Sequence, residues 1–224
     1  MMIRGSPQKK AVIAVLALLG IGWGVITLSR SGRLDLEKKA GAMHRRGGTI
    51  MAELIQQALG NSGRILLITP DMTDMGRADK QRWMNSLLAA FQRALPPGLV
   101  VAARETVVVR PARSTGRLAP GATFTMETYL DMLQRHPGLQ GVVSFAGEPV
   151  VSAGTALPGE VPQLPLVCFC FLGDQVPALM KKGVVAAAVV PRNTPTPYRK
   201  VRGDWFDIMY QVVTPKNIDA WVRP

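Results

Sequence analysis

The sequence predicts an α/β protein, a three-layer sandwich with a mainly parallel sheet, preceded by one N-terminal transmembrane helix. Three observations support this prediction. Short apolar runs without polar alternation are separated by segments with helical periodicity. The chain has 224 residues, of which 47% are hydrophobic, and this is enough to bury a sizeable core. One further apolar run, near the N-terminus, is too long for a buried strand.

That long run begins at Ala11, ends at Leu28 and contains no charged residue. As a helix it would span about 27 Å, close to the thickness of a bilayer's hydrocarbon core. We therefore expect a membrane anchor. The basic residues Arg4, Lys9 and Lys10 leave a cleaved signal peptide as the alternative, although the apolar run exceeds the length usual for such peptides.

The formal net charge is +12, and much of it lies in the first 46 residues. The segment 30–48 resembles a polybasic juxtamembrane stretch that could touch anionic headgroups, with a solvated linker as the alternative. Nucleic acid is not favoured as a partner, because charged residues make up only 19% of the chain. The predicted organisation is a basic segment over 1–10, a transmembrane anchor over 11–29, a basic linker over 30–48 and the α/β domain over 49–224.

The first element of this domain is a helix over 49–59. Gly47 and Gly48 are expected to break the chain before it, so that Thr49 stands as its N-cap. Apolar residues recur through this segment at helical spacing, which predicts one buried face.

The next element is a strand over 65–68, bounded by Gly63 and Pro70. An uninterrupted apolar run of this kind is typical of a strand buried on both faces of a parallel sheet. The same alternation continues to the C-terminus, which predicts helices over both faces of the sheet. The later expected elements are a helix over 79–95, a strand over 99–103, a helix over 125–136, strands over 142–145 and 166–171, a helix over 175–182, strands over 184–190 and 210–213, and a short helix over 217–221.

The residue types that usually carry catalysis or bind metal are sparse. Cys168 and Cys170 share one face of a strand, where we expect buried small residues too far apart for a relaxed disulfide. His44 and His136 have no Cys, Asp or Ser partner at a recognisable spacing. Neither a dinucleotide-binding nor a P-loop glycine pattern occurs in the sequence. The sequence therefore predicts no cofactor, no metal and no enzymatic activity.

Taken in order, the segments over 51–221 resemble the C-terminal lobe of the type 1 periplasmic-binding-protein superfamily, specifically the ribose- and galactose-type sugar-binding proteins of ABC transporters. The most specific piece is YLDMLQRHPGLQGVVSFAGEPVVSAG, which is similar to the family's helix, His-Pro turn, apolar strand and following loop. The other similar pieces are MAELIQQALGNSGRILLIT, RWMNSLLAAFQRALPPGLVVAARET, ALMKKGVVAAAVV and YQVVTPKNID. The family's first lobe would need more than a hundred residues before position 51, so we expect at most half of a clamshell pocket here.

The resemblance places the family's sugar-binding side chains at the carboxyl ends of the strands. At the matching positions this sequence has Ala146, Phe171 and Pro191, whose side chains neither donate nor accept hydrogen bonds. Glu148 and Asp174 lie near those positions and could compensate, or they could be solvated loop acids. We therefore expect sugar binding to be lost. The predicted residues of the degenerate cleft are Phe145, Ala146, Phe171 and Pro191.

The favoured function is a non-enzymatic, membrane-anchored interaction or scaffold subunit, derived from a sugar-binding lobe and part of a larger membrane complex. The alternative is a membrane-tethered solute-binding or sensory module with a changed ligand. The balance of basic residues on the two sides of the apolar run does not decide its orientation. We expect a single-pass membrane protein with the domain on the extracytoplasmic, periplasmic side, because the family that it resembles works there.

Overall fold

The computed structural model describes residues 37–71, 78–108, 124–151, 163–170, 173–192 and 204–221. The chain divides into two units, Met1–Ala42 and Met43–Pro224. The α/β fold lies in the second unit, and all packing described below belongs to that unit.

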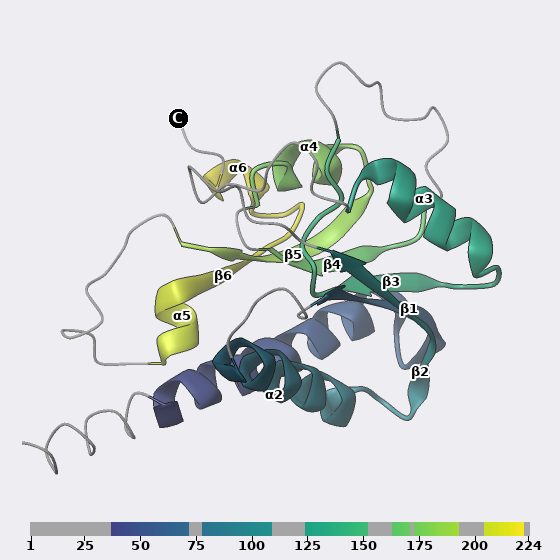
Figure 1. The fold of residues 1–224 in the computed structure, drawn as a ribbon. Helices are drawn as coiled ribbons and strands as arrows, with labels where there is room; N and C mark the ends of the chain where they lie inside the picture. Colours follow the sequence, from purple (N-terminus) through teal and green to yellow (C-terminus); the bar gives the residue numbers. More distant parts are fainter. Residues whose placement is uncertain are drawn as a thin grey trace, which may run out of the picture. The chain divides into compact units, whose positions relative to one another are not determined.

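A six-stranded sheet forms the centre of the described part of the second unit (Figure 1). Its order is β2-β1-β3-β4-β5-β6, and only β6 is antiparallel to its neighbour. The prediction of an α/β fold with a mainly parallel sheet is confirmed. The strands are β1 (Ser62–Asp71), β2 (Gly98–Val108), β3 (Gly141–Ser144), β4 (Leu166–Phe169), β5 (Val185–Pro191) and β6 (Tyr210–Val213).

Helices cover both faces of this sheet. Residues 37–59 are helical and are called the N-terminal helix below. The helices that follow are α2 (Ala78–Ala94), α3 (Met126–Arg135), α4 (Val176–Lys181), α5 (Trp205–Met209) and α6 (Ile218–Trp221). Each helix expected after the first strand occurs within two residues of its predicted bounds. The five-residue α5 is the element that the sequence pattern missed.

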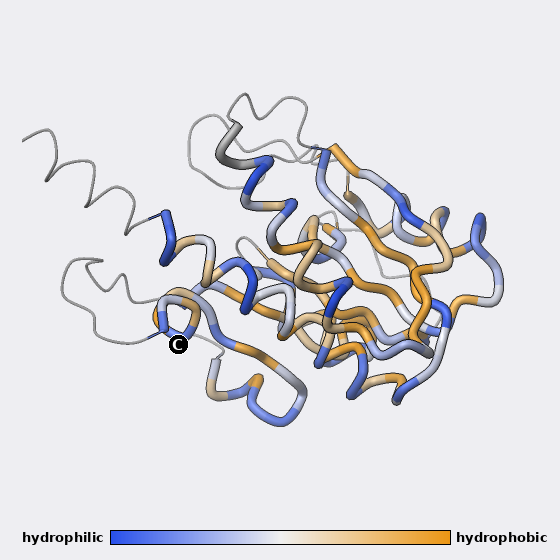
Figure 2. Tube along the Cα trace, turned by 90° about the horizontal axis from the view of Figure 1, so that it is seen from below, coloured by the Kyte–Doolittle hydropathy of each residue, from blue (hydrophilic) through white to orange (hydrophobic). Residues whose placement is uncertain are grey.

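Successive β1 side chains explain why its apolar run is unbroken. Ile65 and Leu67 pack into a core shared with the N-terminal helix and α2. Leu66 and Ile68 point to the other face and pack with α3 and α4. All four side chains are fully buried, so neither face of the strand tolerates a polar residue. Figure 2 shows the resulting hydrophobic stretches along the central strands.

The predicted break at Gly47 and Gly48 is wrong, because both glycines lie inside the N-terminal helix. Their role is close packing. A Cβ at Gly48 would collide with the carbonyl oxygen of Leu87 and lie 2.8 Å from the backbone nitrogen of Phe91, both in α2. A Cβ at Gly47 would lie 3.1 Å from the ring of Phe169. Glycine is costly within a helix, but here it permits the helix to approach its neighbours.

No helix in the described ranges has both the length and the apolar character needed to cross a membrane. The predicted anchor, over 11–29, lies outside these ranges, as does the basic segment over 1–10. The predicted linker is described from residue 37 onward, where it is helical rather than irregular.

A register shift in β2 decides which side chains face α3. Ile65 pairs with Val101, but the next β1 residue, Leu66, pairs with Ala103, so Ala102 is an extra residue in β2. Such a bulge moves the following side chains to the opposite face of the sheet. Glu105 thereby reaches the α3 side, where its carboxylate bonds to two residues at the end of that helix, as described below.

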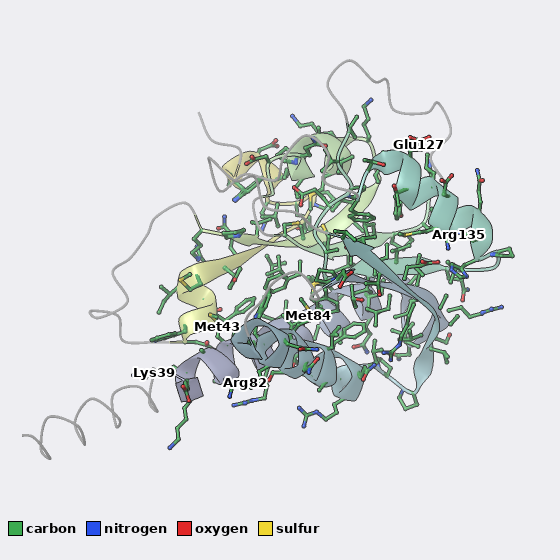
Figure 3. The ribbon with its side chains drawn as sticks, in the orientation of Figure 1. Lys39, Met43, Arg82, Met84, Glu127 and Arg135 are labelled. Atoms are coloured by element: carbon green, nitrogen blue, oxygen red, sulfur yellow. The ribbon has the colours of Figure 1, made fainter. Side chains whose placement is uncertain are left out.

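Helix α3 begins and ends with residues suited to those positions. The Oγ1 of Thr125 accepts a hydrogen bond from the backbone nitrogen of Thr128 at 3.2 Å, which caps the N-terminus. Figure 3 shows Glu127 and Arg135 at opposite ends of the helix. An acid in the first turn and a base in the last both complement the helix dipole.

Candidate functional site

The turn after β3 is closed by its own polar groups. Ser144 is fully buried, and its hydroxyl donates to the carbonyl oxygen of Gly147 at 2.7 Å. The same Oγ accepts a hydrogen bond from the backbone nitrogen of Ala146 at 3.2 Å. The turn requires glycine at 147, whose φ of 95° is unfavourable for other residues. The hydroxyl hydrogen and one acceptor position of Ser144 therefore serve the fold.

The structure does not bring the four predicted cleft residues together on one surface. Phe145 is 1% exposed and meets Phe91 of α2 edge to face, with ring centroids 5.4 Å apart. Ala146 is 2% exposed and belongs to the core on the opposite face of the sheet. Pro191 is half-buried at the end of β5 and pairs with Tyr210. Phe171 lies outside the described residues.

The side chain of Gln175, just before α4, also bonds to the protein's own backbone. Gln175 accepts from the backbone nitrogen of Val151 at 2.7 Å and donates to its carbonyl oxygen at 3.2 Å. This pair of bonds fastens the loop after β3 to the start of α4. Of the two acids considered from the sequence, Asp174 is exposed, whereas Glu148 is half-buried and close to Cys170.

The thiols of Cys168 and Cys170 lie at the carboxyl end of β4 and are free and fully buried. Burial within the core was expected, but the sulfur atoms come closer than strand spacing suggested. The Cys170 thiol donates to the Cys168 sulfur at 3.3 Å, and the Cys168 thiol donates to the carbonyl oxygen of Ala187 at 3.9 Å. Burial, followed by Cys168 and Glu148, raises the pKa of Cys170 well above its ordinary value.

An open groove runs between the N-terminal helix and β6, and we call it the β6 groove. Its volume is about 350 Å³. Its lining combines two arginines and two acids with amide, hydroxyl and apolar side chains. The lining residues are Arg46, Ile50, Glu53, Leu54, Gln57, Arg192, Phe206, Asp207, Tyr210, Gln211, Val212 and Thr214.

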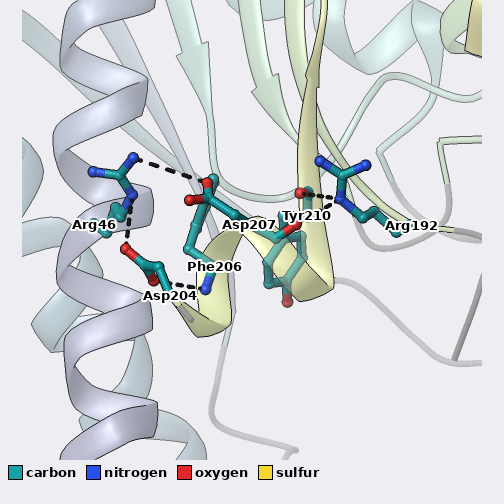
Figure 4. Close-up of polar contacts among 6 residues, drawn as sticks. All are labelled: Arg46, Arg192, Asp204, Phe206, Asp207 and Tyr210. Carbon is teal, nitrogen blue, oxygen red and sulfur yellow. Dashed lines mark hydrogen bonds and ion pairs between the residues drawn. The ribbon is translucent and has the colours of Figure 1, made fainter. Parts of the chain in front are cut away.

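Ion pairs join the two sides of the β6 groove. The Nε of Arg46, on the N-terminal helix, lies 3.0 Å from a carboxylate oxygen of Asp204, and a terminal nitrogen lies 3.8 Å from Asp207 (Figure 4). Asp204 also caps α5, because its other carboxylate oxygen accepts from the backbone nitrogen of Phe206 at 2.9 Å. Asp204 thus couples the start of α5 to the N-terminal helix.

Arg192 holds α5 against β6 from the opposite end of the groove. Its Nε donates to the carbonyl oxygens of Asp207 at 2.6 Å and of Tyr210 at 3.1 Å (Figure 4). A terminal nitrogen donates to the side-chain oxygen of Gln211 at 3.3 Å. These contacts were not predicted. Asp204 before a short apolar segment was the available signal for α5, whereas no local pattern pairs Arg46 or Arg192 with it.

Aromatic rings support the base of this region. Tyr210 stacks on Phe206, with ring centroids 5.5 Å apart, and packs against Phe169 of β4 at 5.0 Å. Phe206 is 2% exposed, so the short helix α5 is anchored by one buried ring. The groove therefore has a packed base and a charged, solvent-facing rim.

The two histidines take different roles. Burial, followed by the charge of Arg45, lowers the pKa of His44 to about 4, and its ring packs edge to face against Trp83 at 5.5 Å. The Nε2 of His136 lies 2.7 Å from the Oε1 of Glu105. The same oxygen lies 2.8 Å from a terminal nitrogen of Arg135. Glu105 was not predicted as a partner, because β2 and the end of α3 meet only in the tertiary fold.

The described residues contain no group of three or more His, Cys, Asp or Glu placed to hold a metal ion. Among these residues, the carboxylates of Glu105 and Asp204 face Arg135 and Arg46, and Asp204 also accepts from a backbone nitrogen at the start of α5. In this part of the chain the polar contacts mainly position elements of secondary structure.

No known family and no curated protein sequence matches this chain. Solved structures do match. The sugar-binding protein of a sugar ABC transporter from Bacillus halodurans shares 15% identity over 80% of this chain and 64% of its own, with a TM-score of 0.52. A solute-binding protein from Burkholderia graminis, solved with D-arabinose, shares 18% identity over 80% of this chain and 62% of its own, with a TM-score of 0.49.

An arabinose-binding protein from Geobacillus stearothermophilus shares 14% identity over 80% of this chain and 63% of its own, with a TM-score of 0.49. The chain thus spans less than two thirds of the length of these three proteins. The structural similarity to the Bacillus halodurans protein shows that this chain shares the fold of a sugar-binding protein of an ABC transporter over 64% of that protein's length, as the sequence resemblance implied.

Proposed function

We propose that this chain is a non-enzymatic interaction or scaffold subunit of a membrane complex, built on a sugar-binding fold that no longer binds sugar. The observation that carries the proposal is how polar side chains are used at the carboxyl edge of the sheet. Ser144, Gln175 and Arg192 all direct their hydrogen bonds to groups of the protein itself.

A sugar site needs several convergent donors and acceptors, because each buried hydroxyl of the ligand must be paired. Leaving one such hydroxyl unpaired costs about 1 to 3 kcal/mol. The two described positions that match the family's binding residues, Ala146 and Pro191, have no polar side-chain atom. Ala146 is also buried in the core, so a ligand at the surface would not reach it.

The β6 groove is the surface that we assign to a protein partner. Its charged rim has both signs, and its base contains aromatic and aliphatic side chains. This combination of apolar centre and polar rim is typical of protein interfaces. Arg46, paired with Asp204 but half-exposed, is suited to exchange its partner for a carboxylate of another protein.

Calorimetric titration tests the loss of sugar binding. We expect no saturable heat with D-ribose, D-galactose, D-arabinose or D-allose, while the arabinose-binding protein from Geobacillus stearothermophilus serves as the positive control for D-arabinose. A saturable heat with any of these sugars for the intact chain would overturn the proposal.

Photocrosslinking in native membranes tests the surface. A photoreactive amino acid replaces Gln57, an exposed residue of the groove, or Gln92, an exposed residue of α2 outside it. We expect a discrete protein adduct from position 57 and none from position 92. Equal labelling from both positions would show that the groove is not a specific interface.

The alternative function is a membrane-tethered solute-binding or sensory module with a changed ligand. The groove volume of about 350 Å³ favours this alternative, since small-molecule sites begin at about that size. A thermal-shift screen with charged small molecules separates the two functions. A ligand that raises the midpoint temperature of unfolding of the unaltered chain, but not of Arg192→Ala, would favour the alternative.

We further propose that the chain is anchored by the segment over 11–28, with its α/β domain on the extracytoplasmic, periplasmic side. The native thiols of Cys168 and Cys170 are buried and so provide little background for labelling. In a Gln92→Cys variant, an impermeant maleimide should label the protein in intact cells. Protection until the cells are lysed would place the domain on the cytoplasmic side.

A further inference from the structure

The edge of β6 that faces away from β5 is closed to a further strand. The carbonyl oxygen of Tyr210 accepts from Arg192, and that of Val212 accepts from the side-chain amide of Asn217 at 3.0 Å. The backbone nitrogen of Tyr210 donates to the carbonyl oxygen of Phe206 in α5. An added strand needs such backbone groups for its own hydrogen bonds. A protein segment in the β6 groove must therefore bind mainly through side chains.

The helical wall of the groove has the pattern of a surface that packs against a second helix. Its lining residues, over 46–57, recur mainly at intervals of three and four, so they share one face of the N-terminal helix. This face is about 16 Å long, or about three helical turns. Ile50 on this wall and Val212 on the strand wall are both half-buried and pack on the core beneath. The two walls thus leave apolar area between them for a helix to cover.

Each wall also carries one charge that no described residue neutralises. Glu53, on the helical wall, is exposed and forms no ion pair within the described ranges. Arg192, on the strand wall, bonds there to neutral oxygens, which are two backbone carbonyls and the side chain of Gln211. A guanidinium has five N–H groups, so at least three of them are still available for a ligand.

We propose that the β6 groove binds an amphipathic helix of the protein partner, with an acidic side chain beside Arg192 and a basic side chain beside Glu53. This step rests on the proposed function, because it takes the groove to be a partner surface. The apolar stripe of the bound helix covers Ile50 and Val212. Arg192 is suited to bind a carboxylate, because three contacts already hold its guanidinium and less side-chain entropy is lost on binding.

The two unneutralised charges also fix the direction of the bound helix. Turning a helix end for end in the groove exchanges its two flanks. The reversed helix would place its acid beside Glu53 and its base beside Arg192, and like charges that face each other oppose binding. One direction is therefore preferred, and the charge pattern of the partner helix decides which.

The experiment begins with a display library of helical peptides of about 15 residues, near the shortest length at which an isolated helix forms. Each peptide has a fixed apolar stripe and random residues on both flanks, and the library is selected against the full chain in mild detergent. We expect the enriched peptides to carry Asp or Glu on one flank and Lys or Arg on the other. A photoreactive residue in place of the acid should crosslink to the fragment that contains Arg192.

Charge exchange at Glu53 then tests the contact on the helical wall. Glu53→Lys should weaken binding of an enriched peptide by about fivefold in fluorescence anisotropy, as expected when an exposed ion pair becomes a repulsion. A peptide whose basic flank is changed to Glu should restore binding to this variant and bind the unaltered chain less tightly. Glu127→Lys, on an exposed position of α3 outside the groove, is the matched control and should leave the affinity unchanged.

The proposal is overturned if the enriched peptides show no charge bias on their flanks, or if Glu53→Lys binds them as tightly as Glu127→Lys does. Failure of the charge-exchanged peptide to restore binding would also overturn it. These outcomes differ from failure of the proposed function. A discrete adduct from position 57 in native membranes that persists in Glu53→Lys would retain the groove as a partner surface and reject the charged helix as its occupant.

Discussion

At the ends of β3 and β4 the polar groups are buried and bond to other groups of the protein. By contrast, the end of β5 and the length of β6 border the open β6 groove. In the first region Ser144 and both cysteines are fully buried, and their polar atoms meet groups of the same turn, of the same strand or of the neighbouring strand β5. In the second region Arg46 and Arg192 bridge separate elements at the surface. The central strands therefore provide a rigid core, and the last strand provides the adaptable surface.

The difference follows from position in the sheet. Strands β3 and β4 have neighbours on both sides and helices on both faces, so their ends contain mainly apolar residues. Strand β6 is at the edge of the sheet and is only half-buried for most of its length. Edge positions are where a fold can change its surface without disturbing its core. The predictions below test this contrast by comparing losses of stability in the two regions.

The largest effect is expected for Phe145→Ala. Removing a fully buried ring that packs on Phe91 should lower the free energy of unfolding by about 3 to 5 kcal/mol. Chemical denaturation followed by circular dichroism measures this loss. A loss below 1 kcal/mol, within the range expected for a surface residue, would mean that the β3 end is not part of the rigid core.

Ser144→Ala should have the next largest effect. The substitution removes the hydroxyl that bridges Ala146 and Gly147 and leaves a buried backbone nitrogen without its acceptor. The expected loss of stability is about 1 to 3 kcal/mol. Ser144→Cys is the control of similar size, because a thiol is a weaker hydrogen-bonding group than a hydroxyl. Its stability should lie between that of the unaltered chain and that of Ser144→Ala. Stability unchanged in Ser144→Ala would contradict the closed-turn description.

Arg192→Ala should have a smaller effect on global stability, about 1 kcal/mol, because its hydrogen bonds lie at an exposed site. Its local effect should be larger. Hydrogen exchange at 205–213 should accelerate, since the guanidinium fastens α5 to β6. Arg192→Lys retains the charge but cannot reproduce the forked contacts, so it should behave like the alanine variant.

The ion pair between Arg46 and Asp204 should contribute at most about 1 kcal/mol, because both side chains are half-exposed. A double-mutant cycle of Arg46→Ala and Asp204→Ala measures the coupling. Asp204→Asn separates the two roles of this residue, because it keeps an oxygen for the α5 cap and loses the charge. A coupling free energy above 2 kcal/mol would exceed the value expected for an exposed ion pair and would contradict the description of the groove rim as an adaptable surface.

At neutral pH the smallest effect is expected from His44, because the lowering of its pKa from 6.5 to about 4 on folding changes stability only under acid conditions. The neutral imidazole is favoured in the folded state, so its contribution is complete above pH 6.5 and is lost as the pH falls toward 4. His44→Gln should flatten the dependence of stability on pH in this window. An unchanged slope in the variant would assign the acid sensitivity to other groups.

Sequence patterns predicted the core of this molecule well and its groove poorly. The run over 65–68 identified β1 because a strand buried on both faces excludes polar residues at every position. The helix expected over 125–136 matches α3 within one residue at each end. By contrast, Arg46 was assigned to a linker, and α5 was not predicted, because one helical turn has too few residues for a periodic signal.

The sequence by itself determined the order of strands and helices and the α/β class, because apolar periodicity is a local property of the chain. The tertiary structure decided how distant parts meet. The sequence alone predicts a chain break at Gly48, whereas the structure shows that this glycine permits close packing against α2. Likewise, the bulge in β2 turns Glu105 toward α3. The approach of the two thiols to 3.3 Å also depends on packing. Such contacts depend on register and interhelical distance, which no short stretch of sequence encodes.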